Sequence, residues 1–191
     1  MEADAVLIAT ERLLLRPISR ADNEAVFAYR SDGEANQFQG FVPTSLAEVD
    51  AFIARNPAEL NLPESWFQLV MVEQASKQVI GDVGIHFLGA DGFQCELGCT
   101  LSRFYQGKGL ATEAMRGTIH YLFTELKKHR IIGSVDPQNV ASIQLLERLG
   151  FRKEAHFKES LMVKGAWVDD VIYALLRKEW KGEEELPSSP S

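Results

Sequence analysis

The clearest alternation of apolar and polar positions in the chain predicts a helix that begins after residue 110. Its apolar residues follow one another at spacings of four, four, three and four, so they share one helical face: Ala111, Met115, Ile119, Leu122 and Leu126. Glu113 in the first turn, and the basic residues after position 126, complement the helix dipole. We expect this face to pack against the core of the protein.

Local start and stop signals predict three more helices. Ser45 and Glu48 form a capping-box sequence, and Ser19 or Asp22 offers a cap for an earlier helix. Pro57 marks the end of the helix that Ser45 begins, because the residue before a proline avoids helical geometry. The predicted helices span residues 19–30, 45–56 and 139–149.

Runs rich in Val, Ile, Leu and aromatic residues predict the strands. Three consecutive runs between residues 66 and 101 are joined by short linkers, one of which contains the turn pair Asp91-Gly92, so an antiparallel meander is expected there. The predicted strands span residues 12–16, 66–73, 79–88, 93–101, 131–135, 156–163 and 167–176.

Length and charge narrow the class of protein. The chain has 191 residues, of which 46% are hydrophobic, and no break in composition divides it, so we expect one domain over residues 1–180. Residues 181–191 are rich in Glu, Pro and Ser and are predicted to be a disordered tail. A net charge of −7 argues against a nucleic-acid binder that relies on bulk positive charge, and suits a cationic acceptor such as an amine.

The sequence lacks the marks of export or membrane insertion. Residues 1–10 contain two acidic residues and no Lys or Arg, unlike a signal peptide, and no run approaches the roughly 20 apolar residues that span a bilayer. We therefore expect a cytoplasmic protein, monomeric or homodimeric, with no membrane partner.

The two cysteines are expected to pack in the core. Cys95 and Cys99 are four residues apart in a predicted strand, which separates them by roughly 13 Å, too far for a disulfide. A single Cys-x-x-x-Cys pair without a second cluster is poor evidence for zinc, so no metal site is expected.

The stretch from Leu97 to Ala114 predicts an anion site, because a strand passes through a glycine-bearing loop into a helix. Gly107 and Gly109 let a ligand approach the backbone closely. The first amides of the following helix have no intrahelical partners, and the helix dipole favours a negative group there. A phosphate or pyrophosphate is the expected ligand.

Two common phosphate loops do not fit this stretch. A P-loop requires Ser or Thr after its Gly-Lys pair, whereas Gly109 follows Lys108, and Ser102 stands where its first glycine would be. A dinucleotide fingerprint requires a third glycine where Thr112 stands, and the stretch lies in mid-chain without an opening βαβ unit.

Gln106, Gly109 and Ala111 instead resemble motif A of the GNAT superfamily of N-acetyltransferases, whose loop amides hold the pyrophosphate of acetyl-CoA. Residues 136–151, which begin Asp-Pro-Gln-Asn and end Leu-Gly-Phe, resemble its motif B. With Trp167 and Asp169, the pattern is similar to the RimJ/RimL-type branch, whose best-known members acetylate the N-terminal amine of ribosomal proteins. The resemblance covers roughly residues 10–180.

The resemblance implies a GNAT fold of the mixed α/β (α+β) class, with a central, largely antiparallel sheet that is splayed at the acetyl-CoA site and flanked by helices. Pantetheine would enter between residues 93–101 and 131–135. Arg103, Lys108 and Arg148 could reach the outer phosphates, although solvated surface charges are the plain alternative. The residues expected to bind the cosubstrate are Thr100, Leu101, Ser102, Gln106, Gly107, Lys108, Gly109, Leu110, Ala111, Thr112, Asn139, Ser142 and Arg148.

The expected chemistry needs no enzyme nucleophile, because an unprotonated amine can attack a thioester directly. The backbone amide of Leu101 is the candidate that polarises the carbonyl, and Glu96 is the candidate base. Many relatives use a tyrosine as the acid where this chain has Leu146, so Ser142 is the substitute candidate. Each polar residue has a plain alternative: an ion-paired surface carboxylate for Glu96 and a helix-start serine for Ser142.

Three hypotheses remain open for the acceptor and the function. The first is a protein N-terminal α-amine, the second a small amine such as a polyamine, an aminoglycoside or an amino sugar, and the third a non-catalytic acyl-CoA-binding module. Residues 33–43, with Phe38 and Phe41, often help to build the acceptor site in this superfamily; without the resemblance they would be a loop with two packed aromatics.

Overall fold

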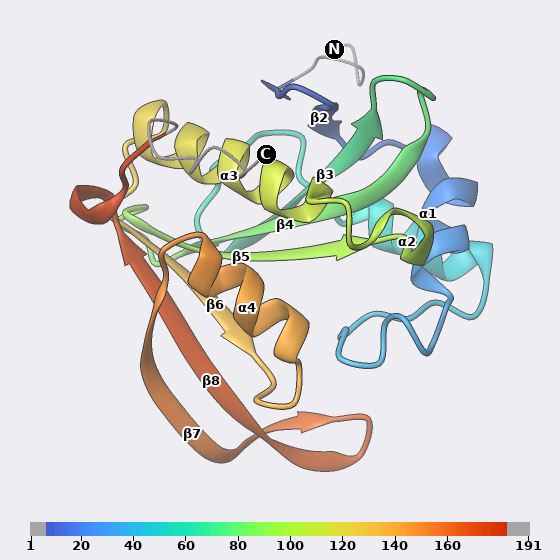
Figure 1. The fold of residues 1–191 in the computed structure, drawn as a ribbon. Helices are drawn as coiled ribbons and strands as arrows, with labels where there is room; N and C mark the ends of the chain where they lie inside the picture. The colour runs from blue at the N-terminus through green and yellow to red at the C-terminus, as the bar shows by residue number, and fades with distance from the viewer. Residues whose placement is uncertain (1–6, 183–191) are drawn as a thin grey trace, which may run out of the picture.

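The computed structural model describes residues 7–182, so the N-terminal residues 1–6 and most of the predicted tail, 183–191, lie outside the described residues. Eight strands form one sheet in the order β1-β2-β3-β4-β5-β6-β8-β7 (Figure 1). Their bounds are β1 Ile8–Ala9, β2 Leu13–Pro17, β3 Ser65–Glu73, β4 Val79–Leu88, β5 Gln94–Leu101, β6 Arg130–Val135, β7 Arg152–Val163 and β8 Ala166–Leu176.

Among the pairs of this sheet only β5 and β6 are parallel, and the neighbours from β1 to β5 form antiparallel pairs. The helices are α1 Asn23–Arg30, α2 Leu46–Ala54, α3 Leu110–Thr124 and α4 Val140–Arg148. The mixed, largely antiparallel sheet with flanking helices is the fold class predicted from the sequence, and it is confirmed.

The core has two parts. The larger cluster packs α3 against the strands through its predicted stripe, with Met115, Ile119 and Leu122 each at most 1% exposed. A smaller cluster, which includes Val26 of α1 and Val49 of α2, joins those helices to Val70 of β3. Figure 1 shows α1 and α2 together at one end of the sheet, whereas α3 runs along the strands and the long β7–β8 hairpin extends away from both.

Two elements differ from the sequence expectation. Strand β1 has only two residues, too few for a periodic pattern to reveal. Strand β7 starts at Arg152 rather than at residue 156. The sequence did not predict the earlier start, because nearly all side chains of this strand are exposed and no alternation of buried and exposed positions marks it.

A buried ion pair ties α1 to β4. Arg30 Nη2 donates to Asp82 Oδ1 over 2.6 Å and Nε donates to Oδ2 over 2.8 Å, while the Tyr29 hydroxyl also donates to Oδ2. Burial alone would lower the pKa of Arg30, but the Asp82 carboxylate raises it above its usual range. Burial and the same carboxylate raise the pKa of Tyr29, so both groups stay protonated at neutral pH.

Removing one partner of this pair should destabilise the fold strongly. Asp82→Ala leaves the Arg30 charge buried and unpaired, which costs about 3–5 kcal/mol of unfolding free energy. The matched control is Asp50→Ala, because Asp50 forms a 3.5 Å pair with the exposed Arg20, worth about 1 kcal/mol or less. Urea unfolding of the two variants measures the difference, and equal losses would contradict the assignment.

Candidate active site

Strands β5 and β6 part after a short stretch of pairing. Their register joins Gln94, Cys95 and Glu96 to residues 130–132, yet β5 continues to Leu101. The outer edge of β5 from residue 97 onward therefore has no partner strand. This gap lies where the resemblance placed pantetheine.

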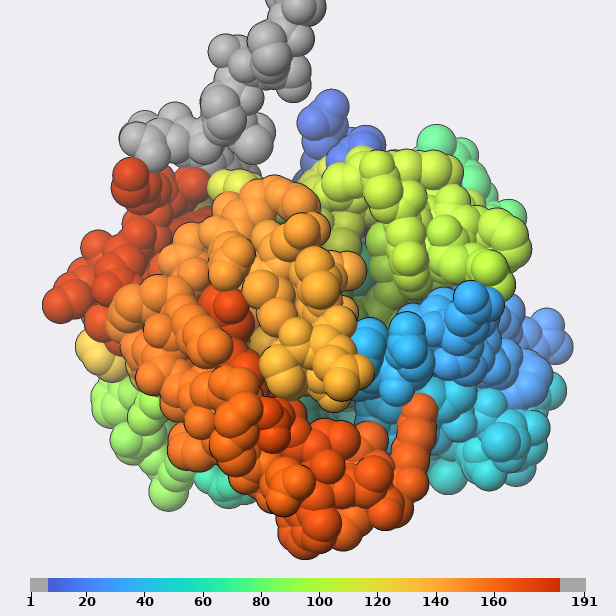
Figure 2. Space-filling model, turned by 60° about the horizontal axis from the view of Figure 1, so that its bottom comes forward, coloured from blue at the N-terminus to red at the C-terminus, as the bar shows by residue number. Residues whose placement is uncertain are grey.

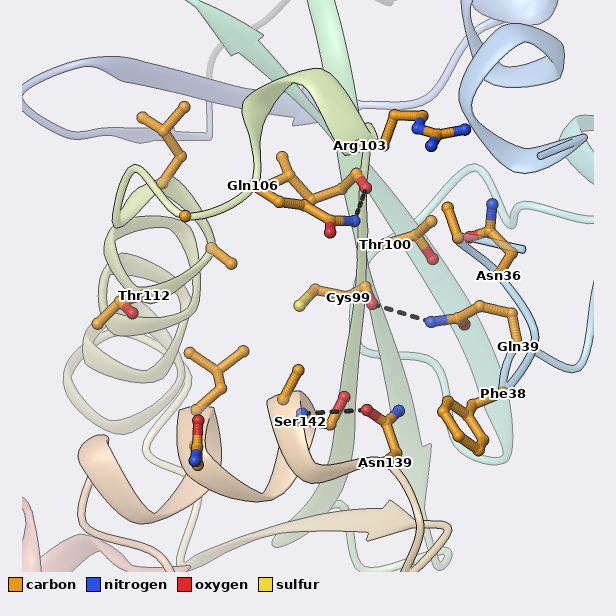
Figure 3. Close-up of a pocket in the computed structure, with 18 of the residues that line it drawn as sticks. Asn36, Phe38, Gln39, Cys99, Thr100, Arg103, Gln106, Thr112, Asn139 and Ser142 are labelled. Carbon is orange, nitrogen blue, oxygen red and sulfur yellow. Dashed lines mark hydrogen bonds between the residues drawn. The ribbon is translucent and has the colours of Figure 1, made fainter. Parts of the chain in front are cut away.

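Side-chain amides occupy two carbonyls on this open edge. Gln106 Nε2 donates to the Leu101 carbonyl over 3.0 Å, and Gln39 Nε2 donates to the Cys99 carbonyl over 3.3 Å (Figure 3). Because alternate residues of a strand face the same neighbour, the Leu101 N–H points to the gap as well. The edge thus presents backbone donors and acceptors to an extended ligand.

The loop before α3 has the backbone conformation of an anion site. Gly107 and Gly109 have φ values of 74° and 77°, in the left-handed region that favours glycine, and Gly109 is the residue that caps α3. Glu113 N–H bonds to the Gly109 carbonyl, so the amides of residues 110–112 precede the first regular helix bond. Together with the helix dipole, they favour a negative group.

Residues close to the N-terminus hold the same loop in place. Arg12 Nε donates to Glu113 Oε2 over 2.6 Å, and Arg12 Nη1 donates to the Lys108 carbonyl over 2.9 Å. Thr10 Oγ1 donates to Glu113 Oε1, also over 2.6 Å. Burial raises the pKa of Glu113, but these bonds outweigh it and the net pKa is lowered. This contact is not predictable from local sequence pattern, because its partners are about 100 residues apart.

A cavity of about 690 Å³ runs from this loop to the gap. Figure 3 shows α3 on one side of β5 and the segment that carries Asn36, Phe38 and Gln39 on the other, and Figure 2 shows the surface hollowed between the region of α4 and the loop before α3. The expected site residues that line the cavity are Thr100, Leu101, Gln106, Gly107, Gly109, Leu110, Ala111, Thr112, Asn139, Ser142 and Arg148.

Three expected residues do not line it. The Ser102 N–H donates to the Ile80 carbonyl over 2.8 Å, so this amide is already used in the fold. Lys108 Nζ lies 5.1 Å from the centroid of the Tyr105 ring. Glu96 lies on the opposite face of the sheet from Cys95, beside His86.

The candidate phosphate-binding arginines have different surroundings. Arg103 lines the cavity, and its Nη1 lies 3.1 Å from Asp32 Oδ2, on a side chain that is 54% exposed. Arg148 Nη1 donates to Thr112 Oγ1 over 3.1 Å, which aims the guanidinium of α4 at the first turn of α3. Both side chains can therefore reach the mouth of the cavity.

Helix α4 begins at the gap. Asn139 Oδ1 accepts the Ser142 N–H over 3.1 Å and caps the helix. Ser142 also lines a second cavity of about 120 Å³, which continues between β5 and β6 and is bordered by Gly98 and Ser134. Ser142 is thus placed where the two strands separate.

Residues 33–43 match both alternatives that the sequence left open, since some line the cavity and others only pack. Residues 34–39 line the main cavity, and Phe38 also borders the second one. Phe41 instead stacks on Phe52 of α2, with ring centroids 4.6 Å apart. The sequence did not single out Gln39, because no motif marks it. Gln144 and Leu145 of α4 lie within the motif B stretch, were not among the expected binding residues, and also line the main cavity.

The titratable groups near the gap fit proton transfer rather than covalent catalysis. The net pKa of Glu96 is raised. Burial raises this pKa, and His86, whose Nδ1 lies 3.8 Å from the carboxylate, lowers it by less. Burial also raises the pKa of Cys99 to about 12, so this thiol stays protonated and weakly nucleophilic at neutral pH. Cys95 is buried and likewise has a pKa of about 12.

Within residues 7–182, no group of three or more His, Cys, Asp or Glu side chains could hold a metal ion. No helix in the same range is both long and apolar enough to cross a membrane.

Comparisons with known proteins agree with this geometry. The family model described as "Acetyltransferase (GNAT) domain" matches residues 12–152. The chain is 33% identical to an uncharacterized N-acetyltransferase, p20, of Bacillus licheniformis, over 91% of this chain and 97% of that protein. It is 34% identical to the [ribosomal protein uS5]-alanine N-acetyltransferase of Escherichia coli, over 64% and 63% of the two chains.

A solved acetyltransferase (GNAT family) from Bacillus anthracis superposes with a TM-score of 0.81. It is 28% identical, and the match covers 90% of this chain and 99% of that one.

Proposed function

The chain belongs to the GNAT family of acetyltransferases, and on that premise we propose that it transfers the acetyl group of acetyl-CoA to the N-terminal α-amine of a protein. The observation that carries the proposal is the open edge of β5, which faces a cavity that begins at the left-handed glycines before α3. The likeness to an enzyme that acetylates a ribosomal-protein alanine supports the choice of acceptor.

The proposed cosubstrate follows the cavity from one end to the other. The amides of residues 110–112 would hold the pyrophosphate, with Arg103 and Arg148 near the outer phosphates. The free groups of the β5 edge would pair with the pantetheine amides, as an added strand does. Asn139 would lie beside the arm, and the Leu101 N–H would donate to the thioester carbonyl.

The amine would then attack the carbonyl carbon of the thioester. A C–N bond forms, the C–S bond breaks, and the electron pair leaves with sulfur. Glu96 would accept a proton from the amine, through water because the carboxylate lies outside the cavity lining, and Ser142 would donate one to the departing thiolate. An α-amine has an ordinary pKa near 8, so its deprotonation needs little assistance.

The proposed acceptor is tested by following free thiol while the protein is incubated with acetyl-CoA and a panel of acceptors. We expect free thiol to be released with peptides that carry a free α-amine, and none to be released with the same peptides when they are N-acetylated. Thiol release only with polyamines, aminoglycosides or amino sugars would show that the acceptor is a small amine and not a protein α-amine. Binding of CoA without release on any member of the panel would favour a non-catalytic module.

Gly109→Val should weaken CoA binding by about tenfold or more. A side chain at a φ of 77° costs about 1–2 kcal/mol or displaces the loop, and either effect misaligns the amides at the start of α3. Isothermal titration with CoA measures the change. Gly33→Ala is the control, because a Cβ there meets nothing within 4 Å. Unchanged affinity in Gly109→Val would place the pyrophosphate elsewhere.

Glu96→Gln should lower kcat/KM by about 100-fold, the lower range for loss of a general base. Because burial raises the pKa of Glu96, the acid limb of the wild-type pH profile should lie above the ordinary carboxyl range, and it should disappear in the variant. Glu24→Gln, on an exposed position of α1, is the control. A profile that keeps its acid limb would remove Glu96 as the base.

A further inference from the structure

The second cavity, of about 120 Å³, continues the path of the cosubstrate into the sheet. Cys99 of β5 and Ser142 of α4 line both this cavity and the main one, so the two cavities adjoin at these residues. Figure 3 shows Cys99 on β5 near the start of α4, where Ser142 and Asn139 lie. In acetyl-CoA the acyl group is the end of the molecule that is farthest from the adenine nucleotide. A cosubstrate that runs from the loop before α3 to the gap would therefore place its acyl group in the second cavity.

One side of the second cavity is apolar. Leu97 of β5, Met115 of α3 and Leu146 of α4 line it, and each of these residues is at most 5% exposed. They do not belong to the lining of the main cavity, so this wall lies beyond the point where the two cavities meet. Each methylene group that leaves water for an apolar wall gains about fourfold in affinity. The wall therefore favours an acyl chain that continues past the carbonyl carbon.

The second cavity is larger than an acetyl group requires. An engineered apolar cavity of about 150 Å³ in another protein holds benzene, which has six carbons. On the same scale, a volume of about 120 Å³ has room for about four or five carbons, whereas an acetyl group has two. Gly98 contributes to this room, because it lines the cavity and a Cβ built on it would meet no atom within 4 Å. An acyl chain of three or four carbons therefore has space there.

The polar groups of the second cavity favour an acyl chain without charge. Asp136 lines the cavity, and its Oδ1 accepts the Gln138 N–H over 2.8 Å. Ser134 also lines it and donates to Asp170 Oδ1 over 2.7 Å. These groups thus have partners within the protein and need none from a ligand. Two carboxylates on this side would repel a third one at the end of an acyl chain.

We propose that the second cavity is the acyl pocket, and that the protein transfers straight, uncharged acyl groups of up to four carbons, which are propionyl and butyryl as well as acetyl. The inference rests on the proposed function and extends it from the acceptor to the donor. The reaction is the same for each chain length. The amine nitrogen bonds to the acyl carbonyl carbon and loses a proton to the base, the C–S bond breaks, and the electron pair leaves with sulfur, which is then protonated.

The wild-type protein tests the range of donors. One amine that the protein acetylates is combined with a series of acyl-CoA thioesters, the release of free thiol is followed, and mass spectrometry identifies the acylated amine. We expect kcat/KM for propionyl-CoA and butyryl-CoA to lie within about tenfold of the value for acetyl-CoA. Succinyl-CoA also has four acyl carbons but ends in a carboxylate, so its kcat/KM should be about 100-fold below that of butyryl-CoA. A larger fall from acetyl-CoA to propionyl-CoA, or equal values for succinyl-CoA and butyryl-CoA, would overturn the inference.

Gly98→Val tests whether the acyl chain lies in the second cavity. The added side chain takes up room in the pocket, so the ratio of kcat/KM for butyryl-CoA to that for acetyl-CoA should fall by about tenfold or more. Gly98→Ala is the second variant, and its smaller side chain should lower the same ratio by less. Gly33→Val is the matched control and should keep the wild-type ratio, because Gly33 lines neither cavity and a Cβ there also meets nothing within 4 Å.

The outcomes separate this inference from the proposed function. Wild-type donor ratios in both Gly98 variants would overturn the acyl pocket. A raised KM for the amine with unchanged donor ratios would also overturn it, because the cavity would then hold the acceptor. Transfer of all three acyl groups to small amines alone would overturn the proposed acceptor and leave the acyl pocket intact. A wild-type protein that releases no thiol from any donor would overturn the proposed function, and the inference with it.

Discussion

The backbone groups that β6 leaves unpaired on β5 are the constraint on which the site depends. Buried N–H and C=O groups need partners, and a strand that lost its neighbour in mid-sheet would ordinarily be unfavourable. Here two side-chain amides, from Gln39 and Gln106, cover two of the carbonyls. Because these are side chains rather than a strand, a ligand with amides of its own can replace them without disturbing the ladders on either side.

The fully paired half of the sheet, β1 to β5, stabilises the fold beside this gap. Four antiparallel ladders hold β1 to β5, and the Arg30–Asp82 pair fastens α1 to β4, next to the strand that opens. On the other side, α4 packs closely on β6, because Gly133 leaves room for Leu146, whose atoms come within 3.0 Å of where a Cβ would be. The gap is therefore a fixed feature between two packed halves.

The sequence predicted what depends on local pattern. The stripe of α3, the capping box of α2 and the glycines before α3 identify their elements, because spacing and turn chemistry act over a few residues. The roles of Gln39 and Arg12 could not be predicted in this way. Gln39 and Arg12 act on segments about 60 and 100 residues away.

The contact of Arg12 with Glu113 also bears on the order in which the protein matures. Its two ends are 101 residues apart, so β2 leaves the ribosome long before its partner helix exists. Contacts of such separation form late, after chain closure has been achieved by other means. The loop expected to receive the nucleotide can therefore reach its final shape only after residue 113 has been synthesised, and a nascent chain that ends before this residue would carry no functional anion site.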